Sequence, residues 1–222
     1  MPKSRQRKKS KKKSSPKPWA VDWRVPAIRS VAHYPIHECL INAEWRESRM
    51  ASIVLSRRRP DGRLAAAAFA VDLGCLGVKS AMGNGALTAV DYQRGIVERG
   101  GIEYIPCDPA FAVKLIQGAV AYAKNLGFNP DPDFNYAKEL FGDIDPAPCT
   151  ETIEYGDGGK PLYVAGPYDD VDKIMNHLER RLGRDHFHFL IPIGAPPEDW
   201  LDDADDESED DDPEEAAGPR RG

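Results

Sequence analysis

Three side chains that could take part in hydrolysis lie between residues 71 and 79. Asp72 supplies an acid, Cys75 a thiol and Lys79 an amine, and they follow a predicted strand end, where loops commonly carry function. A nucleophilic thiol needs a nearby base or a helix N-terminus to lower its pKa, and no histidine is close to Cys75 in the sequence. Two interpretations follow: a hydrolase-type catalytic site, or a buried structural cysteine beside an aspartate that forms turn hydrogen bonds.

A pair of histidines could bind a metal ion. His186 and His188 occupy alternate positions, so in a strand both would point to the same face. Imidazole nitrogens are common zinc ligands, but a site needs at least a third protein ligand. The candidates for that ligand are His177 and Asp185. Exposed histidines opposite a core-facing Phe187 and Phe189 explain the same pattern, so we expect no cofactor and keep the metal site as the alternative.

The N-terminal segment is strongly basic. Residues 3–17 contain nine Lys and Arg residues and no acid, which predicts a disordered arm that repels itself. Basic side chains release counterions from phosphates and so bind DNA or RNA without reading sequence. The arm has no aromatic residue to stack on bases. A solubilising tail or a nuclear-import signal explains the same composition. The expected nucleic-acid contacts in the arm are Lys8, Lys9, Lys11, Lys12 and Lys13.

Further cations cluster at a predicted turn. Arg57, Arg58 and Arg59 precede Pro60, and Arg63 follows it. At a hairpin tip these side chains could hold a nucleic-acid backbone or an acidic peptide. The alternative is a charged edge that discourages pairing between strands of different molecules.

The C-terminal segment has the opposite charge. Residues 198–215 contain thirteen Asp and Glu residues and no base, so a second disordered tail is predicted. This tail could bind a basic partner or fold back on the arm. Because it repels the phosphates that the arm attracts, the expected binding of nucleic acid is weak or self-masked.

The charged ends define the predicted domain organisation. We expect a basic arm over residues 1–18, one globular domain over 19–197 and an acidic tail over 198–222. No run of about 18 apolar residues is present, and no apolar segment follows the basic N-terminus, so neither a transmembrane helix nor secretion is expected. The four cysteines form no CxxC pair, which is typical of reduced thiols in a cytoplasmic protein.

Turn residues and hydrophobic periodicity predict the elements between the tails. Strands over 50–57 and 63–73 flank Pro60-Asp61-Gly62, and strands over 150–155 and 160–165 flank a glycine-rich turn, so two hairpins are expected. Other predicted segments are helices over 35–50, 89–98, 109–126, 133–141 and 169–182, a loop over 74–85 and a strand over 186–192.

The helix over 109–126 carries the strongest boundary signals. Asp108 suits the N-cap, Pro109 the first helical position and Gly127 the residue after the helix. Most of its circumference is apolar, so we expect it to be buried at the centre of the domain. The predicted fold class is α+β: a single domain with antiparallel hairpins packed on a largely buried central helix, flanked by disordered tails.

Several short motifs occur between residues 33 and 170. They are Pro35-Ile36-His37-Glu38-Cys39-Leu40 with Trp45, Met50-Ala51-Ser52-Ile53, Val71-Asp72 with Cys75-Leu76-Gly77-Val78-Lys79, Gly118-Ala119 with Tyr122-Ala123 and Leu126-Gly127-Phe128, and Gly159-Lys160-Pro161 with Gly166-Pro167. The set resembles an uncharacterised family of bacterial cytosolic proteins. That resemblance implies a bacterial cytosolic domain and no particular catalytic residue.

The leading functional hypothesis is a non-enzymatic binding or adaptor protein whose basic arm contacts nucleic acid or an acidic protein. The alternative is a hydrolase-type enzyme that uses Asp72, Cys75 and Lys79, or a metal site at His186 and His188. A purely structural protein is the third possibility.

Overall fold

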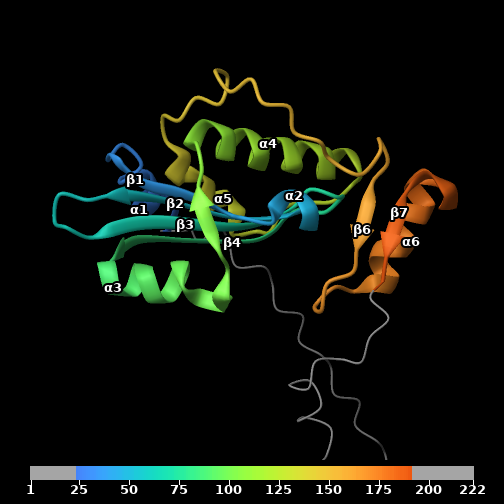
Figure 1. Cartoon of the computed structure of the whole chain (residues 1–222), viewed down its shortest axis with the longest axis horizontal. Coiled ribbons are helices and arrows are strands. Elements are labelled where there is room, and N and C mark those ends of the chain that lie inside the picture. The colour runs from blue at the N-terminus through green and yellow to red at the C-terminus, as the bar shows by residue number, and fades with distance from the viewer. Residues whose placement is uncertain (1–23, 192–222) are drawn as a thin grey trace, which may run out of the picture.

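The chain folds as an α+β protein built on one antiparallel sheet. The structure is a computed structural model that describes residues 24–191 (Figure 1). A five-stranded sheet carries helices on both faces, and a smaller two-stranded unit lies at one end. The predicted α+β class is therefore confirmed, while the predicted basic arm and acidic tail lie outside the described residues. None of the described helices is long and apolar enough to cross a membrane.

The five strands are arranged in the order β4-β3-β2-β1-β5, with every neighbouring pair antiparallel. Their bounds are Ile36–Asn42 (β1), Met50–Arg58 (β2), Leu64–Asp72 (β3), Gly77–Leu87 (β4) and Tyr104–Pro106 (β5). The pairing of β2 with β3 runs without interruption from Met50 opposite Asp72 to Arg58 opposite Leu64, which confirms the first predicted hairpin. Alanine is accepted in β3 because Ala65, Ala66 and Ala67 are fully buried between two helical layers, where small side chains permit close packing.

Two predictions for the sheet were wrong. The segment expected as a helix over 35–50 forms β1 and only a short helix, α2 (Trp45–Ser48). Both faces of β1 are buried at its C-terminal half, so its apolar residues do not alternate with polar ones as in a half-buried strand. The segment expected as a loop over 74–85 belongs largely to β4, whose glycines leave room for neighbours: a Cβ at Gly83 would come within 2.9 Å of the Tyr136 ring.

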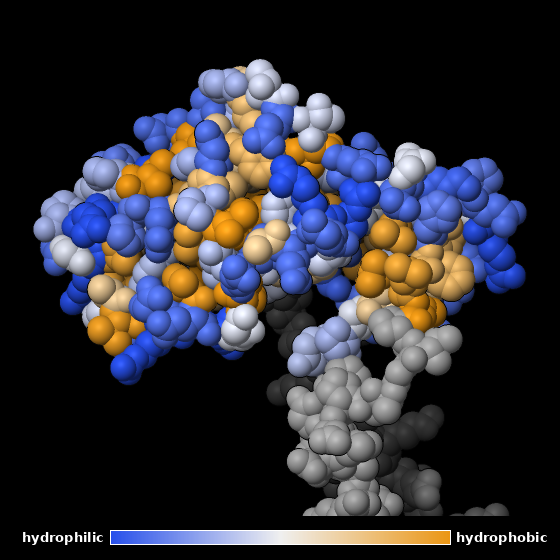
Figure 2. Space-filling model, viewed as in Figure 1, coloured by the Kyte–Doolittle hydropathy of each residue, from blue (hydrophilic) through white to orange (hydrophobic). Residues whose placement is uncertain are grey.

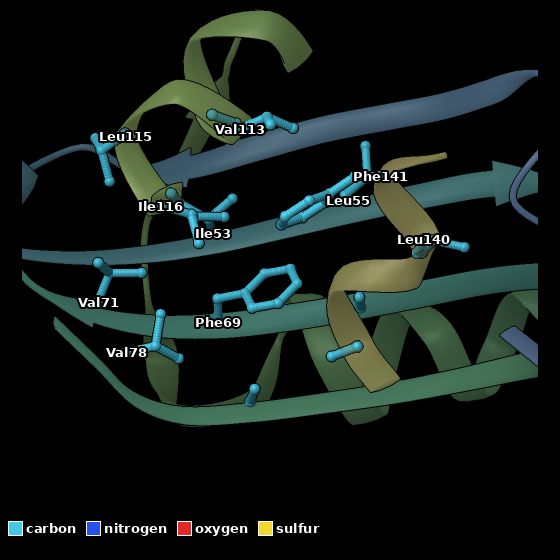
Figure 3. Close-up of a cluster of buried hydrophobic side chains, with 14 of the residues drawn as sticks. Ile53, Leu55, Phe69, Val71, Val78, Val113, Leu115, Ile116, Leu140 and Phe141 are labelled. Carbon is cyan, nitrogen blue, oxygen red and sulfur yellow. The ribbon is translucent and has the colours of Figure 1, made fainter. Parts of the chain in front are cut away.

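One face of the sheet is covered by the long helix α4 (Pro109–Asn125), the short helices α1 (Arg24–Arg29) and α5 (Phe134–Ala137), and the 3-10 turn Lys138–Phe141. The larger hydrophobic core lies between these elements and the strands (Figure 3). Asp108 caps α4 as predicted, its Oδ1 accepting hydrogen bonds from the backbone N–H groups of Ala110 and Phe111. Gln117 and Lys124 are exposed, so α4 is an outer layer and the expected central position is not confirmed.

The opposite face carries a smaller helical cover. The helix α3 (Ala89–Tyr92) continues into a π-helical turn, Gln93–Val97, and together they confirm the helix predicted over 89–98. Thr88 caps α3 by accepting a hydrogen bond from the Asp91 N–H at 3.1 Å. Tyr92 and Ile96 pack with Leu40, Val54, Leu64 and Ala66 of the sheet in a second core cluster.

The C-terminal part of the described chain forms a parallel two-stranded unit. Strands β6 (Leu162–Val164) and β7 (His188–Leu190) pair in parallel, and the helix α6 (Val171–Leu182) connects them. The prediction of a second hairpin was therefore wrong: the glycine-rich turn is present, but residues 150–155 form no strand. They lie along α4 instead, where Tyr155 donates a hydrogen bond to the Leu115 carbonyl. Hydrophobic residues gather on the surface of this unit (Figure 2), where Phe189, Leu190 and Ile191 are exposed.

Candidate functional site

Asp72 has a structural position at the turn between β3 and β4. Its side chain is buried, and Oδ1 accepts hydrogen bonds from the backbone N–H groups of Cys75 at 2.8 Å and Leu76 at 3.4 Å. Burial raises the pKa of the Asp72 carboxyl, and these N–H groups oppose the shift. The carboxylate therefore closes the turn by binding the peptide groups that follow it.

Cys75 and Lys79 do not converge with Asp72 on one cavity. Cys75 is fully buried, and burial followed by the Asp72 charge raises the pKa of its thiol, the opposite of what a nucleophile requires. The Nζ atom of Lys79 lies 2.8 Å from the Asp169 carboxylate. Lys79 lines a hollow of about 560 Å³ beside α6, whereas Asp72 and Cys75 are not among the residues that line it.

The two candidate metal ligands are not on one strand. His186 belongs to the 3-10 turn Arg184–His186 and only His188 belongs to β7, so the expected alternation on one strand is wrong. Phe187 is buried but Phe189 is half exposed, which corrects the expected core-facing pair. Within residues 24–191 no three His, Cys, Asp or Glu side chains are grouped so that they could hold a metal ion.

Arg57 corrects the prediction of an exposed arginine cluster. Its side chain is only 3% exposed because alternation along β2 turns it towards the 3-10 turn Lys138–Phe141, away from the direction of Arg58. Its guanidinium donates to three backbone carbonyls, of Leu140 at 3.0 Å, Tyr34 at 2.7 Å and Phe141 at 2.7 Å. Its Nη2 also lies 3.3 Å from an Asp143 oxygen. Burial lowers the pKa of Arg57, and Asp143 opposes that shift.

The other arginines at the hairpin tip are more exposed. Arg58 is hydrogen-bonded to the Nδ1 atom of His37 at 2.8 Å. Arg59 binds the Asp61 carboxylate and donates to the Gly85 carbonyl at 3.0 Å. Asp61 holds Arg59 within its own turn, so the tip offers a less open cation cluster than the sequence suggests.

A hollow of about 750 Å³ lies between α1, the exposed side of α4 and the 3-10 turn after α5. We call it the basic groove. Its lining residues are Arg29, Ala32, His33, Gln117, Val120, Lys124, Phe134, Lys138, Glu139, Phe141, Gly142 and Asp143.

Among the residues that the structure describes, some charged side chains of the basic groove form ion pairs and others do not. Arg29 Nε lies 2.7 Å from Glu139 Oε2, and this hydrogen bond raises the pKa of Arg29 and lowers that of Glu139. Asp143 contacts the buried Arg57. Lys124 forms no ion pair with any residue that the structure describes, and Lys138 Nζ lies 5.6 Å above the Phe134 ring. Both carboxylates are thus held by arginines, while the two lysines stay available to an anion.

The shape of the basic groove depends on the Arg57 contacts beneath it. The three carbonyls that bind Arg57 belong to Tyr34, which follows the lining residues Ala32 and His33, and to the 3-10 turn, so one side chain joins these two parts of the groove. Gly142 permits this approach, because its φ is +58° and a Cβ there would overlap the Ala32 carbonyl oxygen.

Sequence reasoning missed the basic groove because its cations come from three separate elements. Lys124 lies in the helix predicted over 109–126, and nothing in the sequence links it to Arg29 or Lys138. The predicted arm contacts Lys8, Lys9, Lys11, Lys12 and Lys13 lie outside the described residues. Comparisons with protein-family models, with curated proteins and with solved structures found no match.

Proposed function

We propose that this protein binds nucleic acid without catalysis, through its basic arm and the basic groove together. The observation that carries the proposal is the position of Lys124 and Lys138, which line a groove whose carboxylates are already engaged by arginines. Two lysines that are available to pair with an anion on a concave surface suit a phosphate backbone better than a neutral ligand.

The arm can reach the same ligand as the basic groove. Lys17 is the last base of the arm and α1, one wall of the groove, begins at Arg24. A chain advances at most about 3.6 Å per residue, so Lys17 lies no more than about 25 Å from the start of α1. One nucleic-acid strand could therefore contact both sets of cations.

The chemistry of the groove favours binding that does not depend on base sequence. Its two phenylalanines, Phe134 and Phe141, are buried and offer no exposed ring on which a base could stack. Affinity must then come from phosphates and fall steeply with salt. The thirteen acids of residues 198–215 compete for the same cations, so the complex is weak and readily reversed.

Fluorescence anisotropy of labelled oligonucleotides tests the proposal on the full chain. One variant replaces Lys8, Lys9, Lys11, Lys12 and Lys13 by serine, and a second combines Lys124→Glu with Lys138→Glu. We expect both to weaken binding at about 50 mM salt and to flatten the dependence of log affinity on log salt. A Lys173→Glu and Arg180→Glu variant on α6 is the control and should bind as the parent chain does.

The outcomes separate the two parts of the proposal. Loss of binding in the arm variant alone would remove the groove from the site. Equal binding by all variants, or binding of an acidic peptide in preference to DNA and RNA, would overturn the proposal.

A further inference from the structure

The pairing of β1 with β5 places two cysteines opposite each other. Leu40 pairs with Pro106 and Ile41 with Ile105, so the next pair in this antiparallel register is Cys39 with Cys107. The Cys107 N–H donates to the Cys39 carbonyl at 2.9 Å, which extends the pairing to these residues. Both side chains lie on the α4 side of the sheet, where the Cys107 thiol donates a hydrogen bond to the Asp108 carbonyl oxygen at 3.5 Å.

The Cα separation of such a pair allows a disulfide. Directly opposed residues of a hydrogen-bonded antiparallel pair have Cα atoms about 5.5 Å apart. Natural disulfides join Cα atoms about 4.4–6.8 Å apart, and a hydrogen-bonded pair meets this distance. Its Cβ atoms lie about 4.5–5.5 Å apart, wider than the about 3.5–4.5 Å of a disulfide, so the strands must approach each other slightly and the bond is strained and readily reduced. Both thiols are free in the structure, which therefore describes the reduced state.

The two thiols differ in their access to solvent. Cys39 is 6% exposed and belongs to the main core, whereas Cys107 is partly exposed. Cys107 opens into a hollow of about 150 Å³ whose other walls include Trp45, Arg46 and Glu151. A small oxidant can therefore meet Cys107 first, and Cys39 only through Cys107.

The surroundings of Cys107 favour its thiolate. The hydrogen bond from Cys39 lowers the pKa of Cys107, while burial and the charges of Asp108 and Glu151 oppose this shift. Cys107 also precedes the N-cap of the 17-residue helix α4, whose N-terminus carries partial positive charge. For Cys39 the direction is reversed, since the hydrogen bond with Cys107 and then burial raise its pKa. The partial exposure of Cys107 and the burial of Cys39 assign attack to Cys107 and resolution to Cys39.

We propose that Cys39 and Cys107 form a reversible dithiol–disulfide couple that hydrogen peroxide oxidises. The Cys107 thiolate attacks one peroxide oxygen: an S–O bond forms, the O–O bond breaks, and the departing hydroxide takes a proton to become water. Cys39 sulfur then attacks Cys107 sulfur, so that the S–S bond forms and the S–O bond breaks. The leaving hydroxide combines with the Cys39 proton as a second water. The two sulfurs lose two electrons and the peroxide gains them.

The remaining cysteines provide internal comparisons. Cys75 is fully buried beside Asp72, and burial raises the pKa of its thiol. Cys149 is partly exposed like Cys107 and packs against the same core cluster. Its exposure makes Cys149 the matched control, since it lacks the opposed strand position of Cys107 but is open to the same reagents.

Peptide mapping of the full chain tests the couple. Reduced protein is treated with one equivalent of hydrogen peroxide, the remaining thiols are blocked with N-ethylmaleimide, and the digest is analysed by mass spectrometry. We expect one linked peptide that joins Cys39 to Cys107 within a monomer and is released by dithiothreitol. Cys149→Ser should keep the link, and Cys107→Ser should abolish it.

Two further measurements keep the test decisive. If Cys39→Ser fails to fold, Cys39→Ala replaces it in the experiment. In either variant, oxidised Cys107 should form a mixed disulfide with added glutathione, because the internal partner is missing. In the parent chain, alkylation of Cys107 should be at least about 10-fold faster than that of Cys149 at neutral pH. A chain that keeps four free thiols, or a link from Cys107 to Cys149 or to a second molecule, would overturn the proposal.

Discussion

The Nζ atom of Lys79 lies 2.8 Å from the carboxylate of Asp169, and this ion pair joins β4 of the main sheet to the loop before α6. Asp169 Oδ2 also accepts a hydrogen bond from the Gly166 N–H at 2.9 Å. Both side chains are largely buried, with exposed fractions of 24% for Lys79 and 10% for Asp169. The smaller two-stranded unit is thus attached to the sheet by a shielded pair as well as by apolar contacts.

The ion pair should make stability depend on acid pH. Burial alone would raise the pKa of Asp169, but the Lys79 hydrogen bond, the Gly166 N–H and the Lys79 charge lower it below the ordinary value of 3.8. A lowered folded-state pKa means that the pair stabilises the fold above pH 3.8 and loses this contribution as the pH falls below that value. Asp169→Asn should lower the free energy of unfolding by about 2 kcal/mol at pH 7. Urea unfolding should show this difference shrinking near pH 3, and a constant difference would contradict the assignment.

Arg57 should contribute far more to stability than its exposed neighbours. Arg57→Met removes a buried guanidinium and leaves three backbone carbonyls without their donor. We expect the free energy of unfolding to fall by about 3 kcal/mol. Arg63→Met, at an exposed position of the same hairpin, should change it by less than about 0.5 kcal/mol. Similar losses in both variants would show that the contacts of Arg57 contribute little.

Asp72 should tolerate asparagine better than alanine if its role is structural. Asparagine retains the Oδ1 acceptor for the Cys75 and Leu76 N–H groups and removes a buried charge. Asp72→Asn should stay within about 1 kcal/mol of the parent chain at pH 7, and Asp72→Ala should lose about 2 kcal/mol.

The pH dependence of the Asp72 variants gives the matching check. The folded-state pKa of Asp72 is raised above 3.8, so ionisation costs stability as the pH rises through that folded-state value. Asp72→Asn should therefore become less favourable relative to the parent chain as the pH is lowered from the folded-state pKa of Asp72 towards 3.8, with no further change below 3.8. Equal losses for asparagine and alanine at pH 7 would instead point to a requirement for the carboxylate itself.

Gly118 should resist a change that normally stabilises helices. A Cβ at this position in α4 would overlap the Tyr155 hydroxyl, which donates a hydrogen bond to the Leu115 carbonyl at 3.1 Å. Gly118→Ala should lower the free energy of unfolding by about 1–2 kcal/mol because Tyr155 must move. In a Tyr155→Ala background the same substitution should raise it by about 1 kcal/mol through helix propensity. Thermal unfolding of the parent chain, the two single variants and the double variant gives a double-mutant cycle. If Gly118→Ala stabilised the parent chain, the overlap with Tyr155 would be excluded.

Glu139 should limit the affinity of the basic groove for polyanions. Its ion pair with Arg29 at 2.7 Å keeps that cation from other anions. Glu139→Gln removes one negative charge and frees Arg29, so oligonucleotide binding should tighten by about threefold at low salt. Glu179→Gln on α6, where Glu179 pairs with Arg184, is the control and should leave anisotropy titrations unchanged. A weaker complex for Glu139→Gln would place the ligand elsewhere.

Local chemistry was sufficient to predict the elements whose ends are marked by residue type. The first hairpin follows from Pro60 and Gly62 between β-forming runs, and α4 follows from Asp108 and Gly127 at its ends. Strand β1 was misread because Cys39 and Ile41 face one helical layer while Leu40 faces the other, so the apolar residues are consecutive. Such a run carries no period that separates strand from helix.

The remaining errors concern contacts between segments distant in sequence. The glycines of β4 predicted a loop, but they lie in a strand. Positions 77 and 83 leave no room for a side chain, because α4 approaches Gly77 and Tyr136 approaches Gly83 closely. Strand β6 pairs with β7 beyond α6, so its partner could not be predicted from the adjacent glycine turn. The basic groove was missed for the same reason, since no local pattern relates Arg29, Lys124 and Lys138.

The contacts of Arg57 have a consequence for mutational tolerance. Its three neutral acceptors are peptide carbonyls, which every amino acid supplies, so replacement of residues 34, 140 or 141 leaves the acceptors in place. Position 57 has no such freedom, because only a guanidinium presents enough donors in a rigid fork to serve these carbonyls and Asp143 together. Residues 34, 140 and 141 can therefore change in sequence, whereas their arrangement around the basic groove requires arginine at position 57.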